Sequence, residues 1–131
     1  MVDTSALLAI LFDEAEALDF ARRIADASKP VLSAASYVEF GLLAAARRGY
    51  DRRKVDDAVV RFGLDVVAVS PEQARLAVEA FMRYGRGRHS AGLNFGDCFV
   101  YALAKDWNWP LLYKGNAFTQ TDIASALLPP E

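Results

Sequence analysis

The sequence has 131 residues, of which 53% are hydrophobic and 24% charged, a balance that predicts one folded domain spanning residues 1–131. Its net charge of −2 excludes a strongly basic nucleic-acid coat, but not an RNA-cutting enzyme with an acidic metal pocket. No apolar stretch approaches the ~20 residues that a membrane helix needs, and no basic region precedes the first apolar run. Together with a single cysteine, Cys98, these features predict a cytoplasmic protein without membrane association.

The N-terminal half is predicted to alternate short strands with helices. Residues 1–3 are typical of the stub of a first strand, and helices are expected over about 5–12 and 14–27, the second ending before Pro30. A short apolar strand at 31–32 precedes a helix over 35–48, for which Gly49 is the expected C-terminal cap. Asp51 can cap the next helix, which is expected to run to about residue 62.

The C-terminal half continues the alternation. The β-branched segment 65–69 is predicted to form a buried parallel strand. Ser70 and Pro71 provide the N-cap and the first-turn proline of a helix that ends near residue 84. A basic, glycine-rich loop at 85–92 follows, and Asn94 can cap a helix through residue 105. Residues 110–113 are expected to form a further strand before a polar turn at 115–121 and a short apolar segment.

This alternation predicts an α/β fold, in which a central, mainly parallel sheet lies between two layers of helices. Ligands of such sheets bind beyond the carboxyl ends of the strands, near the point where the strand order reverses. Acidic, basic or nucleophilic side chains at those ends are therefore the first candidates for a functional site.

Most of the 17 acidic residues are explained as members of exposed ion pairs, but Glu39 is not. Many of the others lie three or four residues from an arginine, the spacing of exposed helical ion pairs. Glu39 instead has Leu42 and Leu43 at helical spacing and no Lys or Arg within one turn, so we expect its carboxylate to project towards the core. A buried, unpaired carboxylate must be protonated, hydrogen-bonded or bound to a cation.

Asp97 and Asp3 show the same lack of a local counter-charge. Asp97 shares a predicted helix face with Val100 and Tyr101, although an acid in a first turn can also simply complement the helix dipole. Asp3 ends the first strand, where it could equally be the N-cap of the next helix. Three carboxylates that can reach one crevice, without a His or Cys cluster, favour a hard cation such as Mg²⁺ or Mn²⁺. Such an ion can activate water and neutralise charge on a phosphodiester.

The basic loop at 85–92 is a candidate RNA-binding segment. Arg86 and Arg88 lie shortly before Asp97 in the sequence, so they could contact RNA phosphates near the acidic pocket. The alternative is a solvated, mobile loop. The lone histidine, His89, is expected to belong to this loop rather than to a metal site, and Cys98 is expected to be a buried, inert thiol.

Four segments of the sequence resemble the VapC branch of PIN-domain toxins: VDTSAL at 2–7, SYVE at 36–39, GLNFGDCF at 92–99 and LLYKGN at 111–116. The resemblance covers essentially the whole chain and implies a PIN fold with Mg²⁺- or Mn²⁺-dependent endoribonuclease activity on structured RNA, such as tRNA or ribosomal RNA. It also implies a homodimer that is silenced by a small VapB-like antitoxin, which often places an arginine near the metal site.

The resemblance assigns roles to individual residues. Asp3, Glu39 and Asp97 match the first three acidic positions of the family, which are catalytic and bind metal. Thr4 and Ser5 follow the first acid, where a hydroxyl often supports the site.

The chain departs from the family pattern at Ala117. The subgroup usually has K-G-N-D-F, whereas here Lys114, Gly115 and Asn116 are followed by Ala117, so the fourth acid is missing. Asn116 and Asp122 remain as possible accessory residues, and Asp122 or water could compensate in a natural variant. A second hypothesis is that Ala117 was engineered so that a host tolerates a toxic nuclease. An alanine codon in the native gene would refute it.

Two other functions compete with a nuclease. The loss of the fourth acid is compatible with a catalytically impaired PIN domain that binds RNA or an antitoxin without cleavage. A phospho-receiver domain has a similar length and alternation, but it requires an acid next to Asp3 and an aspartate at the end of the 65–69 strand, and neither is present.

Overall fold

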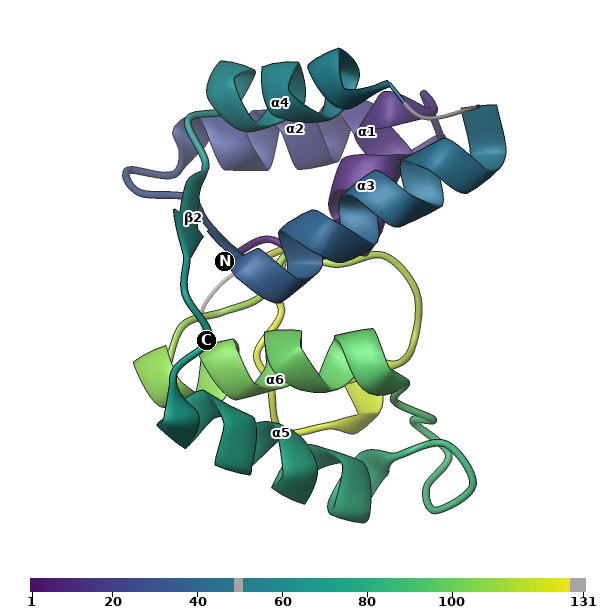
Figure 1. Ribbon diagram of the computed structural model, residues 1–131, viewed down its shortest axis with the longest axis vertical. Helices are drawn as coiled ribbons and strands as arrows, with labels where there is room; N and C mark the ends of the chain where they lie inside the picture. Colours follow the sequence, from purple (N-terminus) through teal and green to yellow (C-terminus); the bar gives the residue numbers. More distant parts are fainter. Residues whose placement is uncertain (49–50, 128–131) are drawn as a thin grey trace.

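Short parallel strands run between two groups of helices in the computed structural model, which describes residues 1–48 and 51–127 (Figure 1). The strands β1 (Val31–Ser33) and β2 (Asp65–Val67) pair in parallel. Val2 extends this pairing, because its N–H donates to the Val31 carbonyl at 2.9 Å and Val2 also bridges in parallel to Leu112. A further parallel bridge joins Leu111 to Ser125.

Val2 therefore lies at the centre of the strand order, with the later segments added on either side of it. β1 and β2 lie on one side, and residues 111–112 and 125 lie on the other. The strand order reverses next to Val2, so the carboxyl end of this segment, where Asp3 begins, is where a ligand site is expected in an α/β fold.

Helices cover the strands on two sides, as expected for three layers (Figure 1). On one side lie α1 (Thr4–Leu11), α2 (Ala17–Asp26), α3 (Ala34–Arg48) and α4 (Arg52–Arg61). On the other lie α5 (Pro71–Tyr84) and α6 (Phe95–Trp107), followed by a 3₁₀ turn at Phe118–Gln120. Each group has its own core. Phe20, Phe40 and Leu7 are buried in the first core, and Leu93 and Leu111 in the second.

The predicted caps are confirmed where the structure describes them. Ser70 accepts a hydrogen bond from the Gln73 N–H at the start of α5, and Asp51 accepts one from Arg53 at the start of α4. The expected cap at Gly49 lies outside the described residues. The second helix begins at Ala17 rather than at residue 14, because Asp13 has a φ of 52° and turns the chain before it.

Two strand predictions were wrong in part. The segment 65–69 was expected to be buried, yet β2 covers only Asp65–Val67 and Val66 is 41% exposed. Among the described residues β2 pairs only with β1, so it is an edge strand and one side of it meets solvent. In the part of the chain that the structure describes, the segment 110–113 pairs only through single bridges at Leu111 and Leu112. No helix in the described part of the chain is both long and apolar enough to cross a membrane.

Candidate active site

Asp3 lies at the carboxyl end of the central segment and begins α1. Its N–H donates to the Leu112 carbonyl at 2.9 Å, which fixes its backbone to the sheet. Its Oδ2 atom accepts hydrogen bonds from the Ser5 N–H at 3.1 Å and the Ser5 hydroxyl at 2.5 Å, so Asp3 is the N-cap of α1. The residue is only 4% exposed, and its Oδ1 atom is buried without a hydrogen bond from any described residue. A capping role therefore accounts for only one of the two carboxylate oxygens.

The surroundings of Asp3 favour its protonated form. Burial raises the pKa of Asp3 from 3.8 to about 7, and the negative charges of Asp97 and Glu39 add to the shift, while the bonds from Ser5 oppose it. The mutual effect of the three carboxylates shows that they lie close enough to interact. The fold thus brings together Asp3, Glu39 and Asp97, which lie far apart in the sequence. These three residues are called the acidic group below.

Glu39 reaches this group from α3, but not for the reason that its helical pattern indicated. Leu42 and Leu43 are 67% and 41% exposed, and the buried positions of α3 are Ser36, Phe40 and Ala44. The predicted apolar stripe is therefore wrong, because α3 packs through residues four apart on a neighbouring face. Glu39 is half-buried at the edge of that face. Burial raises its pKa, a hydrogen bond from Thr4 opposes the shift, and the charge of Asp97 adds to it.

Hydroxyl groups that follow Asp3 support two of the acids. Besides its contact with Glu39, the Thr4 hydroxyl is positioned to donate to the Ser36 carbonyl at 3.2 Å. The Ser5 hydroxyl donates to Asp3 and accepts a hydrogen bond from the Lys114 N–H at 2.9 Å. This link from Lys114 through Ser5 to Asp3 was not foreseen, because only the fold places residues 5 and 114 together.

Asp97 combines a structural role with a place in the acidic group. Its Oδ2 atom accepts the Asn94 N–H at 3.0 Å, and its own N–H donates to the Asn94 side chain at 2.9 Å, so the two residues form a capping box at the start of α6. Burial raises the pKa of Asp97, while the Asn94 hydrogen bond and the positive charge of Arg86 oppose the shift. As expected from the sequence, Val100 and Tyr101 of the same helix are buried.

The basic loop adjoins the acidic group through Arg86, whose charge acts on Asp97. The other predicted RNA contact, Arg88, lies 6.0 Å from the Phe81 ring centre in a cation–π arrangement. His89 is exposed on this loop, and its Nδ1 atom accepts the Ala91 N–H at 3.0 Å. Both arginine side chains are exposed, as contact with RNA phosphates requires.

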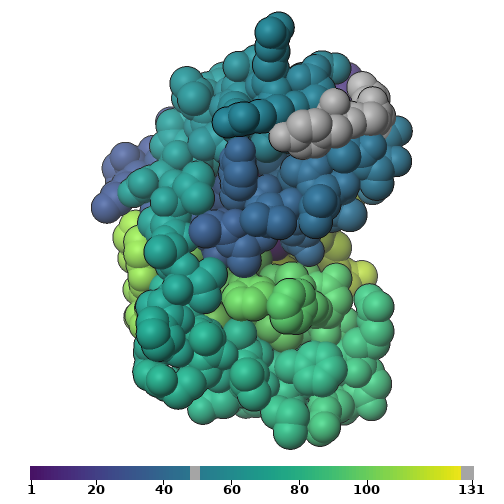
Figure 2. All heavy atoms as spheres, in the orientation of Figure 1, coloured from purple at the N-terminus to yellow at the C-terminus, as the bar shows by residue number. Residues whose placement is uncertain are grey.

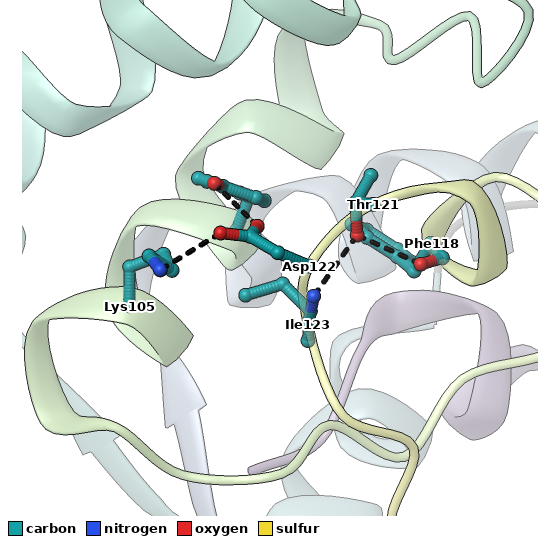
Figure 3. Close-up of polar contacts among 6 residues, drawn as sticks. Lys105, Phe118, Thr121, Asp122 and Ile123 are labelled. Atoms are coloured by element: carbon teal, nitrogen blue, oxygen red, sulfur yellow. Dashed lines mark hydrogen bonds and ion pairs between the residues drawn. The ribbon is translucent and has the colours of Figure 1, made fainter.

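The residues around the missing fourth acid are engaged elsewhere. Asp122 accepts hydrogen bonds from the Tyr101 hydroxyl at 2.7 Å and from Lys105 Nζ at 2.9 Å, one on each carboxylate oxygen (Figure 3). Burial alone would raise the pKa of Asp122, but these two partners lower it. Its contacts therefore give no support to compensation for Ala117. Ala117 itself is half-buried and packs against the core of α5 and α6, while Asn116 is exposed.

The donor set fits a hard divalent cation. The fit is one of chemistry, because in the described part of the chain no three His, Cys, Asp or Glu side chains are placed so that they could hold a metal ion together. Carboxylates repel one another when no cation lies between them, and the raised pKa of Asp3 reflects that repulsion as well as burial. The unpartnered Oδ1 of Asp3 leaves one buried acceptor available, and oxygen donors are what Mg²⁺ and Mn²⁺ prefer.

Comparison with known proteins identifies the family. The chain matches the PIN domain family over residues 1–124. It is 46% identical to VapC ribonuclease Mb0640 of Mycobacterium bovis, over 98% of this chain and 99% of the relative. It is 47% identical to Ribonuclease VapC of Mycolicibacterium smegmatis (95% and 98%) and 42% identical to Ribonuclease VapC36 of Mycobacterium tuberculosis (94% and 90%). The chain belongs to the PIN domain family and, within it, to the VapC ribonucleases.

Proposed function

We propose that this protein is the toxin of a toxin–antitoxin pair and acts as a Mg²⁺- or Mn²⁺-dependent endoribonuclease on structured RNA. The observation that carries the proposal is the buried carboxylate of Asp3, which has one unpartnered oxygen and interacts electrostatically with Glu39 and Asp97. Such an arrangement is costly unless a cation or a proton offsets the negative charge. Its place at the reversal of the strand order supports a ligand site.

Asp3, Glu39 and Asp97 are the residues that would hold the ion, and the ion when bound would activate water and neutralise charge on the phosphodiester. The chain's own residues keep each carboxylate in place. Ser5 holds Asp3, and Asn94 holds Asp97. These hydrogen bonds limit the movement of the two carboxylates. A site of this kind needs such fixed positions for efficient chemistry.

RNA binding is assigned to the basic loop at 85–92. Arg86 provides exposed positive charge beside an acidic group that would otherwise repel a phosphate backbone, and Arg88 adds an exposed charge on the same loop. This segment also explains how a chain with a net charge of −2 can hold RNA, because the positive charge is local.

The proposed partners are a VapB-like antitoxin and a second copy of the chain, in the cytoplasm. An antitoxin arginine would find unpaired carboxylates in the acidic group. Exposed apolar side chains support the dimer: Leu42 is 67%, Met82 56% and Phe95 80% exposed. These residues come from α3, α5 and α6, which share one face of the molecule (Figure 2). Light scattering of a Leu42→Lys variant tests this interface, and an unchanged dimer mass would contradict it.

RNA cleavage tests the nuclease proposal. The purified chain is incubated with tRNA and ribosomal RNA in Mn²⁺ or in EDTA, next to Asp3→Asn and Asp97→Asn. We expect cleavage that requires the metal and is lost in both variants, and an increase in cleavage for Ala117→Asp. Sequencing of RNA ends after brief induction of Ala117→Asp then identifies the bond. If neither the natural chain nor Ala117→Asp cleaves RNA, the proposal fails.

A second candidate function is a binding module without catalysis. It is favoured by Ala117 and by the engagement of both Asp122 oxygens with Tyr101 and Lys105, which leaves the fourth acidic position without an evident substitute. RNA or antitoxin binding by the natural chain, without cleavage in Mn²⁺ but with cleavage after Ala117→Asp, would identify this alternative.

A further inference from the structure

Gly96 is the second residue of α6, and it lies directly against the Glu39 side chain. A Cβ atom built on Gly96 would be 2.0 Å from Glu39 Oε2 and 2.8 Å from Glu39 Cδ. Both distances are below 3.0 Å, which Cβ atoms in proteins essentially never show. The Glu39 carboxylate therefore occupies the space that any side chain at position 96 would take.

The backbone of Gly96 gives no other reason for glycine. Among the glycines that the structure describes, those with positive φ are Gly63, Gly87, Gly92 and Gly115, so Gly96 has a conformation that other residues adopt. Glycine in a helix is less favourable than alanine by as much as about 1 kcal/mol. The close approach of Glu39 is thus the feature of the fold that favours a residue without a side chain here.

We propose that Gly96 is a positioning residue that lets the Glu39 carboxylate lie against the first turn of α6, beside Asp97. The electrostatic effect of Asp97 on Glu39 is consistent with this closeness. An added methyl group would displace the Glu39 carboxylate by at least about 1 Å, since Oε2 would otherwise be 2.0 Å from it. The consequence for metal binding and RNA cleavage rests on the proposed function, whereas the contact between Gly96 and Glu39 does not.

The variant Gly96→Ala tests this role, with Gly41→Ala as its matched control. Gly41 lies in α3 only two residues from Glu39, and a Cβ there would meet nothing within 4 Å. The obstacle at Gly96 is the end of a flexible side chain, so we expect Gly96→Ala to fold. Its kcat/KM for RNA cleavage should fall about 100-fold, the loss typical of a 1 Å misplacement, and its Mn²⁺ affinity about 10-fold. Gly41→Ala should keep both values and unfold at a higher temperature.

A double-mutant cycle of Gly96→Ala and Glu39→Ala, in which unfolding temperatures are measured in EDTA, tests the contact without an activity assay. Removal of the carboxylate frees the space, so Gly96→Ala should raise the unfolding temperature more in the Glu39→Ala background than in the natural chain. An equal rise in both backgrounds would overturn the contact and the inference. If the cycle shows coupling and the natural chain binds Mn²⁺ and cleaves RNA, unchanged Mn²⁺ affinity and kcat/KM in Gly96→Ala would overturn the positioning role.

Failure of the proposed function gives a different result. In that case the natural chain neither binds Mn²⁺ nor cleaves RNA, yet the coupling between positions 39 and 96 in EDTA remains. That coupling would still support Gly96 as the residue that positions Glu39.

Discussion

Replacement of Asp3 by asparagine is expected to change how stability depends on pH. The pKa of Asp3 is about 7 in the folded chain against an ordinary 3.8, so the folded state holds a proton that the unfolded state releases. The stability that Asp3 contributes is therefore complete below pH 3.8 and is lost as the pH rises through about 7. Asparagine can still cap α1, but it does not titrate. The stability of Asp3→Asn should therefore not show this fall as the pH rises.

The size of the effect follows from the shift. One pKa unit corresponds to about 1.4 kcal/mol, so the loss in the natural chain is about 1.5 kcal/mol at pH 5 and about 4 kcal/mol at pH 8. The free energy of unfolding of Asp3→Asn, relative to that of the natural chain, should therefore rise by roughly 2–3 kcal/mol from pH 5 to pH 8. The free energy of unfolding is measured with urea in EDTA at several pH values. Parallel curves for the two proteins would refute the raised pKa, and so would a gain of the opposite sign.

Three further predictions concern the surroundings of the acids. Asn94→Ala breaks the capping box with Asp97 and should lower the free energy of unfolding by about 1 kcal/mol in urea titrations; an unchanged midpoint would contradict the cap. Burial raises the pKa of Cys98 from 9.0 to about 11, so iodoacetamide at pH 8 should modify it about 100-fold more slowly in the native chain than in urea, and equal rates would show an accessible thiolate. Arg86→Ala and Arg88→Ala should each reduce the slope of log affinity for RNA against log salt by about 1, and an unchanged slope would count against the RNA-binding loop.

Local signals in the sequence were sufficient for most elements. The caps at Asp51, Ser70 and Asn94 depend on a side chain and a backbone N–H two or three residues away, so the fold adds little to them. The alternation of strands and helices likewise predicted the three layers. The burial of β2 was not predictable from its residues, because an edge position depends on which strands pair, and Val66 is as apolar as a residue in a central strand.

The acidic group was only partly predictable. Glu39 was selected through an apolar stripe that is in fact exposed at Leu42, so its place beside Asp3 and Asp97 was expected from a pattern that the packing of α3 does not follow. The contact of Glu39 with Gly96 and the link from Lys114 to Ser5 depend on residues more than 50 positions apart. The glycine in the first turn of a helix was the one available signal, since helices disfavour it without a reason of space.

The place of Val2 between β1 and Leu112 has a consequence for synthesis on the ribosome. Val2 occupies the middle of the sheet, but its neighbour Leu112 is made 110 residues later. Until then Asp3 lacks the carbonyl that anchors its N–H, and α6 with Asp97 has only just been made. Contacts between such distant residues form late in folding. A nascent chain therefore cannot complete its acidic group until residue 112 has left the ribosome, and nuclease activity cannot begin before that point.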